Sequence, residues 1–275
     1  MIENISICIP FYNTHKLTVD AIRKIVNLKF ISEIIVSDDF SKKKFFFKHT
    51  KVKIYRNNKN IGALKNKYNT VKLASNDWVY LLDSDNLINA DSLKKLMKFN
   101  NFNKNFYYSP SKLVLQNIDL DKKLDNKSII YNFPKTIIDF KIARIFLRNN
   151  LEYFLWFLNT GNFFINRNKY LGCLKKIFSN SNKNFASMEA DAIVFSYFWL
   201  KSGNKIKILD FLYYYHRMRM KSYSFHKNNY KSTQKYLYLF KYDNFLVIIL
   251  LRIWNEHLLR IYNYLLKFFY KKFLF

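Results

Sequence analysis

The sequence predicts a protein of the α/β class with a Rossmann-like, doubly wound sheet. Short apolar runs alternate with segments of helical periodicity over the first hundred residues, in the order β-α-β-β-α-β-α. Two of the runs end directly in acidic residues, Asp38-Asp39 and Asp83-Ser84-Asp85. Ligands of such sheets bind at the carboxyl ends of the strands, so the acids mark a candidate site. An isolated D-x-D is more often only a solvated turn, so the motif needs support from its neighbours.

The first half of the chain carries four expected strands and three expected helices. The first strand ends at Pro10, before a polar turn, and the run from Trp78 to Leu82 has the apolar and aromatic composition of a buried strand. Between them, apolar residues from Leu17 to Leu28 recur close to helical spacing. Asp91 or Ser92 is a suitable N-cap for the third helix. The expected strands are 5–10, 31–37, 52–55 and 78–82, and the expected helices are 17–28, 63–74 and 91–99.

The second half is less regular between residues 104 and 139, where only two short strands are expected. A polar turn at 159–162 precedes an apolar strand, and a later helix ends near Gly203. The expected strands are 107–110, 129–131, 163–165 and 206–215, and the expected helices are 142–157 and 190–200.

Residues 221–275 are expected to form a basic, aromatic and helical extension. A membrane-spanning helix needs roughly 20 consecutive apolar residues. Charged residues such as Asp243, Arg252 and Glu256 interrupt the apolar runs of segment 236–275, so the segment does not meet this requirement. Two interpretations remain open: an amphipathic helix on an anionic membrane surface, slightly favoured by the charge, or a helix pair packed on the core or on another subunit.

Length and composition limit the number of domains and indicate the cellular compartment. The 275 residues suffice for one large domain, or for one domain with an extension. Two cysteines, Cys8 and Cys173, cannot form a disulfide framework, and the start of the chain lacks the pattern of a signal peptide. We therefore expect a cytoplasmic protein. Peripheral binding to the inner face of the plasma membrane is compatible with this location.

The net charge is +28, from 47 basic and 19 acidic side chains. Such a charge attracts nucleic acid, anionic lipid or phosphorylated substrates. The chain is also rich in Asn, Ile, Phe, Tyr and Lys, which an AT-rich genome favours, so part of the charge reflects codon usage. No nucleic-acid-binding motif accompanies the charge, and no specific nucleic-acid partner is expected.

Four motifs follow one another through the first hundred residues. They are Pro10-Phe11-Tyr12-Asn13, Ile34-Ile35-Val36-Ser37-Asp38-Asp39-Phe40-Ser41, Asn60-Ile61-Gly62 followed by Lys67, and Leu81-Leu82-Asp83-Ser84-Asp85. Together, in this order, they resemble the P-x-Y-N, D-D-G-S, N-x-G…R and D-x-D motifs of the family 2 glycosyltransferases. The resemblance implies the GT-A fold, a mixed sheet flanked by helices, and the transfer of a sugar from a nucleotide donor.

Looser matches extend the resemblance to about residue 220. Thr160-Gly161-Asn162 resembles the loop that borders the acceptor pocket, Glu189-Ala190-Asp191 resembles the acidic motif that supplies the catalytic base, and Tyr215-His216-Arg217 resembles the strand end that closes over the diphosphate. The implied domain is 1–220, with a nucleotide-binding half at about 1–100 and an acceptor half at about 101–220.

The chain departs from the family pattern at several positions. Phe40 stands where glycine is usual, so this turn has a different shape. Lys67 replaces arginine, which keeps the charge and loses the bidentate fork. Tyr68 stands where asparagine is common, and the acids Glu189 and Asp191 are not adjacent.

The resemblance assigns roles to individual residues. Asp191 is the expected general base, with Glu189 as the alternative, and Gly161 and Asn162 are expected at the acceptor. Asp85 is the expected direct ligand of Mn²⁺ or Mg²⁺, with Asp83 at the ribose or a metal-bound water and His216 completing the shell. The residues expected to contact the nucleotide sugar are Pro10, Tyr12, Asp39, Gly62, Lys67, Asp83, Ser84 and Arg217.

The resemblance implies an inverting, metal-assisted glycosyltransferase. The expected donor is a nucleotide-diphosphate sugar, with UDP as the first expectation, and the expected acceptor is a hydroxyl of a surface glycan or lipid-linked glycan. The alternative is a non-catalytic basic protein, associated with membrane or nucleic acid, on a degenerate transferase fold. The retention of Asp39, Asp83, Asp85 and Asp191 favours the enzyme. A nucleotidyltransferase is disfavoured because no glycine-rich loop follows the first strand. An oligomer is compatible with either function.

Overall fold

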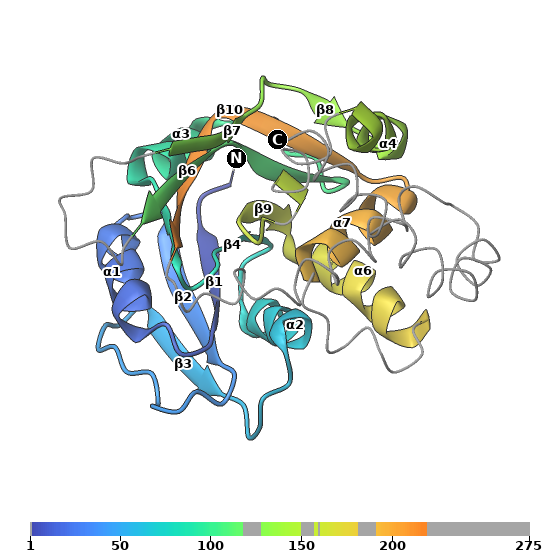
Figure 1. Cartoon of the computed structure of the whole chain (residues 1–275). Helices are drawn as coiled ribbons and strands as arrows, with labels where there is room; N and C mark the ends of the chain where they lie inside the picture. The colour runs from blue at the N-terminus through green and yellow to red at the C-terminus, as the bar shows by residue number, and fades with distance from the viewer. Residues whose placement is uncertain (1, 118–127, 150–156, 159, 181–190, 219–275) are drawn as a thin grey trace, which may run out of the picture.

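The computed structural model describes residues 2–117, 128–149, 157–158, 160–180 and 191–218, arranged as strands and helices around a single sheet (Figure 1). The strands are β1 (Ile5–Phe11), β2 (Ile31–Asp38), β3 (Val52–Arg56), β4 (Trp78–Leu81), β5 (Asn86–Ile88), β6 (Phe106–Asn117), β7 (Ser128–Asn132), β8 (Ile137–Ile138), β9 (Phe163–Asn166) and β10 (Lys205–Met218). The helices are α1 (His15–Ile25), α2 (Ala63–Leu73), α3 (Ala90–Lys98), α4 (Phe140–Asn149), α6 (Arg167–Asn180) and α7 (Asp191–Lys201).

The sheet is mixed, as expected for this class. Its strand order is β3-β2-β1-β4-β9-β6-β10-β5, with β7 paired to β6 and β8 paired to β10. Strands β3, β2, β1 and β4 are parallel, whereas β9 runs antiparallel between β4 and β6. The amino-terminal half of the chain therefore builds the parallel part of the sheet, and the later strands extend it.

Two hydrophobic cores cover the two faces of the sheet. Strand β1 shows the division: Ile5, Ile7 and Ile9 pack with α1 and α3 on one face, whereas Cys8 packs on the other face with α2, α4, α6 and α7. This alternation follows from the two-residue period of a strand. Both faces are buried, which explains why the strand sequences are almost continuously apolar.

The direction of the chain reverses between β1 and β4. Helix α1 carries the chain from β1 outward to β2, and α2 carries it back from β3, past β2 and β1, to β4 (Figure 1). Because the two helices cover opposite faces, the carboxyl ends of β1 and β4 border the crevice in which ligands of such sheets bind. The D-x-D motif directly follows β4 and lies at this switch point.

All seven elements expected in the first hundred residues are present, with ends that shift by a few residues. The structure adds β5, β8 and α6, which the sequence analysis did not assign. Strand β6 is longer than expected because it continues through Pro110, close to an irregularity in its pairing with β10. The expected helix 142–157 is described only as α4, and residues 150–156 lie outside the described residues.

In the described ranges, no helix has both the length and the apolar character needed to cross a bilayer. The proposed extension at 221–275, including segment 236–275, lies outside the described residues. Its helical structure and its membrane contact therefore stay predictions.

Candidate active site

The D-x-D turn is held by residues from both halves of the chain. The ammonium nitrogen of Lys67, on α2, lies 3.0 Å from Oδ1 of Asp83. The backbone N–H of Asp83 donates to Oδ1 of Asn162, just before β9, at 3.0 Å. Lys67 and Asn162 are both buried, so these contacts are shielded from water. Asp83 is consequently held at its carboxylate by Lys67 and at its backbone by Asn162.

Gly161 is required by close approach to the same carboxylate. A Cβ atom at this position would lie 2.2 Å from Oδ1 of Asp83, far inside van der Waals contact. Only glycine lets the loop before β9 approach the D-x-D turn this closely. Gly161 and Asn162, which were expected at the acceptor, thus both contact Asp83 in the structure, and their role toward an acceptor stays a prediction.

A cluster of hydroxyl groups joins the start of α1 to the D-x-D turn. The Thr14 hydroxyl donates a hydrogen bond to Oγ of Ser84 at 2.7 Å. The Thr18 hydroxyl donates one to the backbone carbonyl of Ser84 at 2.9 Å. Thr14 is the N-cap residue of α1, but its side chain does not cap the helix. A threonine at this position commonly stabilises the helix by about 1 kcal/mol. Here its hydroxyl instead holds the central residue of D-x-D.

Arg217, near the end of β10, ties the same turn to α1. Its Nε donates to the backbone carbonyl of Asp85 at 2.8 Å. The guanidinium also bonds Oδ2 of Asp20 at 2.8 Å and the carbonyl of Leu17 at 2.7 Å. Arg217 is buried, and these acceptors all belong to the protein. The expected contact between Arg217 and the phosphates therefore stays a prediction, whereas its bracing of the turn is seen directly.

His216 reaches the residue that follows D-x-D. Its Nδ1 lies 2.8 Å from Oδ1 of Asn86, on β5, which pairs with β10. Over the described residues, no three His, Cys, Asp or Glu side chains gather into a ready-made metal site. The carboxylates of Asp83 and Asp85 are hard oxygen donors, which suits a cation that completes its shell with water and substrate phosphates. The donor chemistry therefore fits Mn²⁺ or Mg²⁺, with His216 as a predicted additional ligand.

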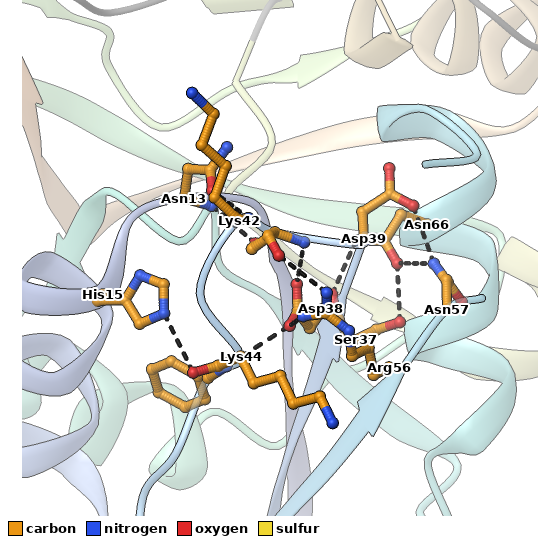
Figure 2. A network of polar contacts seen from close by, with 12 residues as sticks. Asn13, His15, Ser37, Asp38, Asp39, Lys42, Lys44, Arg56, Asn57 and Asn66 are labelled. Carbon is orange, nitrogen blue, oxygen red and sulfur yellow. Dashed lines mark hydrogen bonds and ion pairs between the residues drawn. The ribbon is translucent and has the colours of Figure 1, made fainter. Parts of the chain in front are cut away.

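Asp39 directly follows β2, which is separated from β4 by β1, and it lies in a network of polar contacts (Figure 2). Its carboxylate accepts hydrogen bonds from the backbone N–H groups of Ile61 and Gly62, at 2.9 and 3.0 Å, and from Asn57 at 2.9 Å. Gly62 precedes α2 with φ of 85°, a conformation that glycine adopts readily. Asp39 and Gly62, both expected to contact the nucleotide, thus contact each other.

Asp38 has a structural role in the following loop. Its Oδ1 accepts from the N–H of Ser41 at 2.8 Å, and its Oδ2 pairs with the guanidinium of Arg56 (Figure 2). Side chains alternate between the two faces of a strand, so two adjacent acids take different positions, and Asp38 is the one that caps the turn.

The different turn shape expected from Phe40 is not seen in the backbone, because this residue adopts a conformation typical of glycine. This residue adopts φ of 62°, in the left-handed region that glycine favours, and the guanidinium of Arg56 lies 5.0 Å from the centre of its ring. A left-handed conformation costs a bulky residue about 1–2 kcal/mol. Two hydrogen bonds between this turn and Asn13, from Lys42 N–H to Asn13 Oδ1 and from Asn13 N–H to Ser41 Oγ, offset part of that cost.

Four candidate site residues remain: Pro10, Tyr12, Asp191 and Glu189. Pro10 lies on β1 opposite Ser37 of β2, and Tyr12 is exposed just beyond the end of β1. Asp191 is the first residue of α7, and Glu189 lies outside the described residues. The structure therefore joins Lys67, Asp83, Gly161 and Asn162 in one cluster, and it does not decide between the two candidate bases.

Several residues of the site were not found from the sequence. Thr14 and Thr18 are one helical turn apart, Asn86 directly follows D-x-D, and Asn57 and Asn66 bond to each other beside Asp39. The i, i+4 spacing of the two threonines was an available signal. The asparagines gave no usable signal, because this residue is abundant throughout the chain.

Two buried tyrosines, Tyr80 and Tyr214, interact electrostatically with Asp83. Burial raises the pKa of Tyr80, on β4, well above its ordinary value, and the negative charge of Asp83 acts in the same direction. Burial also raises the pKa of Tyr214. Both side chains are therefore neutral at physiological pH and add no charge to the site.

The doubly wound mixed sheet, with acids at the ends of β2 and β4, defines a protein of the GT-A fold class. Residues 6–174, more than half of the chain, match the family described as Glycosyl transferase family 2. The chain therefore belongs to the family 2 glycosyltransferases.

Solved structures support the same fold. The chain is similar to GalNAc-T7, crystallised with UDP, GalNAc and Mn²⁺, at 15% identity and a TM-score of 0.55, covering 86% of this chain and 48% of that one. It is also similar to residues 1–349 of TarS from S. aureus in complex with UDP-GlcNAc, at 17% identity and a TM-score of 0.56, covering 86% and 66%. The chain thus spans about half of the first structure and just under two thirds of the second. None of the curated proteins compared with it matches.

Proposed function

We propose that this protein transfers a sugar from a nucleoside-diphosphate donor, with UDP-linked donors as the first candidates, to a hydroxyl group of a surface glycan or lipid-linked glycan. The observation that carries the proposal is the intact D-x-D turn at the switch point, braced by Lys67, Asn162 and Arg217. The close contact of a carboxylate, a buried lysine and a glycine distinguishes this motif from a solvated turn after a strand. The proposal of a non-catalytic protein is correspondingly weaker.

The donor would lie across the carboxyl ends of β1, β2 and β4. Asp39 would face the base or ribose, and the ammonium group of Lys67 would face the diphosphate. The crystallised relatives hold UDP or UDP-GlcNAc, which makes UDP-sugars the first donors to test. The sugar itself and the acceptor stay open, because pocket shape rather than a motif selects them.

A divalent cation bound by Asp85 and Asp83, with His216 as a further ligand, would neutralise charge on the departing diphosphate. The crystallised GalNAc-T7 contains Mn²⁺, which supports this cofactor for the present chain.

The chemical step needs one proton acceptor. Asp191, or else Glu189, would take the proton from the acceptor hydroxyl, whose oxygen then forms the bond to the anomeric carbon as the bond to the diphosphate breaks. Attack from the face opposite the diphosphate inverts the anomeric configuration. Asp191 is the first residue of α7, a position that suits an acid because the positive end of a helix dipole lies at the helix N-terminus.

Thermal unfolding in the presence of nucleotide sugars tests the proposal, because a ligand of the native state raises the unfolding temperature. We expect UDP-sugars to raise it with Mn²⁺, and Asp85→Asn to abolish that rise without changing the stability of the free protein. The failure of every nucleotide sugar to shift unfolding, with or without Mn²⁺, would favour the non-catalytic alternative.

A further inference from the structure

The loop between β2 and β3 concentrates positive charge beside the candidate site. It begins directly after Asp39 and contains Lys42, Lys43, Lys44 and Lys48. No aspartate or glutamate occurs between Phe40 and Asn76, and the two acids that precede the loop, Asp38 and Asp39, are buried and bonded to protein donors. In Figure 2 the Lys42 and Lys44 side chains extend away from the hydrogen-bonded network around Asp38.

The backbone of this basic loop, residues 40–48, is anchored to the fold. The Phe45 ring is buried 4.7 Å from the ring of Phe11, and the Phe45 N–H points to Asp38 at 3.5 Å. His15 Nε2 lies 3.3 Å from the carbonyl oxygen of Lys44, and Arg56 donates to the carbonyl of Ser41 at 2.8 Å. The loop therefore has a defined shape, and binding through it would not require costly ordering.

Phe46 is the aromatic residue of the basic loop that is most exposed to solvent. Its side chain is 77% exposed, whereas the adjacent Phe45 is buried. Phe40, on the same loop, and Tyr12, on the adjoining loop, are each about half exposed. The hydrogen bonds between Asn13 and the 41–42 backbone join the two loops into one surface. An exposed aromatic ring, with exposed lysines before and after it in the sequence, is therefore presented by an anchored loop.

We propose that the basic loop docks the protein on an anionic lipid bilayer. The Phe46 ring would enter the boundary between headgroups and acyl chains, and Lys42, Lys43, Lys44 and Lys48 would contact anionic headgroups. Lysine suits this position because its aliphatic stem tolerates the apolar side of the interface while its charge stays at the headgroups. A nucleic acid would use the lysines, but it would cover Phe46 only where a base stacked on it, so the bilayer accounts for both features.

Docking through this loop would bring the carboxyl edge of the sheet to the membrane surface. The loop starts at Asp39, and Asn13 joins it to the residues before α1. The candidate site would then open at the level of the headgroups, where a lipid-linked acceptor would be presented. The docking itself does not depend on the proposed function, because it can be measured without any sugar donor.

Sedimentation of the full-length protein with phosphatidylcholine vesicles, with and without phosphatidylglycerol, tests the proposal. We expect binding only to the anionic vesicles, falling as salt is raised. Phe46→Ala should weaken it about tenfold, as expected for an aromatic ring removed from the interface. Changing Lys42, Lys43 and Lys44 together to Gln should weaken it about a hundredfold at low salt.

Two variants serve as matched controls. Changing Lys169, Lys175 and Lys176 to Gln removes the same charge from exposed positions of α6, and Ile145→Ala removes an exposed apolar side chain from α4. Neither should change vesicle binding. Equal losses in these controls would show a general charge effect and overturn the proposal.

Three further outcomes would also overturn it. Unchanged binding of both loop variants would assign membrane contact to residues 236–275 or to another surface. A loss of stability in Phe46→Ala typical of a buried phenylalanine would mean that a segment of this chain covers the ring. Loop variants that lose RNA binding but keep vesicle binding would identify a nucleic-acid surface.

Discussion

Position 161 has no room for a side chain, because the carboxylate of Asp83 lies where a Cβ atom would be. The Gly161 backbone lies close to the Asp83 carboxylate, so the D-x-D turn can keep this geometry only if residue 161 lacks a Cβ atom. Lys67 occupies the other side of the same carboxylate. The two contacts together leave Asp83 little freedom to move.

We expect Gly161→Ala to displace the Asp83 carboxylate and to lower transfer activity by at least about a hundredfold, since small misplacements at a reacting centre are costly. Gly172→Ala is the matched control, because a Cβ there meets no neighbouring atom. Rates with a UDP-sugar and thermal unfolding would be measured for both. Full activity in Gly161→Ala would show that the turn relaxes without consequence.

The two candidate bases can be separated by isosteric substitution. We expect Asp191→Asn to lower kcat by at least about a thousandfold with little change in donor affinity, because the amide cannot accept the proton. Glu189→Gln should keep most of the activity. The reverse pattern, measured as turnover together with donor binding by calorimetry, would make Glu189 the base.

At the scale of elements, α1 is coupled to the D-x-D turn by three side chains. Thr14 and Thr18 hold Ser84 through hydroxyl groups, and Arg217 joins the carbonyl of Asp85 to Leu17. A movement of α1 would therefore be transmitted to the carboxylates. We regard Thr14, Thr18 and Arg217 as positioning residues for the proposed reaction.

We expect Thr18→Val, which keeps the shape and removes the hydroxyl, to raise the Mn²⁺ concentration needed for half-maximal activity about tenfold. It should also cost about 1–2 kcal/mol of stability, the usual effect of a lost buried hydrogen bond. Thr18→Ser should restore the metal response, which a purely structural defect would not predict.

Thr70→Val provides the comparison for this effect. Thr70 is also a buried helical threonine, and its hydroxyl donates to the Asn66 carbonyl of its own helix at 2.6 Å. It should lose stability without a change in the response to Mn²⁺. Equal metal responses in the Thr18 and Thr70 variants would contradict a positioning role for Thr18.

Most elements of the parallel part of the sheet could be predicted from local patterns, whereas the additions to it could not. Strands β5 and β8 are too short to show a period, and α6 begins with the polar residues Arg167, Asn168 and Lys169. Their structure depends on pairing and packing with distant parts of the chain. Local sequence carries little information on such contacts.

At the scale of the whole molecule, Glu33 braces the edge of the sheet opposite the candidate site. Its buried carboxylate accepts hydrogen bonds from Ser6 at 2.7 Å, from the Ser75 N–H at 2.6 Å and from Lys53 at 2.8 Å. Burial alone would raise the pKa of Glu33, but the hydrogen bonds from Lys53, Ser75 and Ser6 outweigh it and lower the pKa from 4.5 to about 2.

This shift predicts a pH-dependent stability. Above pH 4.5 the carboxylate is charged in both states, and its stabilisation, up to about 3 kcal/mol, is fully present. As the pH falls from 4.5 toward 2, the unfolded state takes up the proton first and the stabilisation is lost. Urea unfolding of the wild type and Glu33→Gln should differ most near pH 7 and converge near pH 2. A constant difference across this range would contradict the lowered pKa.

The sequence by itself determined the α/β class, the family motifs and the placement of acids at strand ends, because these follow from local periodicity and composition. Only the tertiary structure showed that Lys67, Gly161 and Asn162 meet at Asp83, and that Arg217 braces Asp85. It also showed that Asp38 caps a turn while Asp39 binds the start of α2. These contacts join residues far apart in the chain, so their geometry arises only when both faces of the sheet are packed.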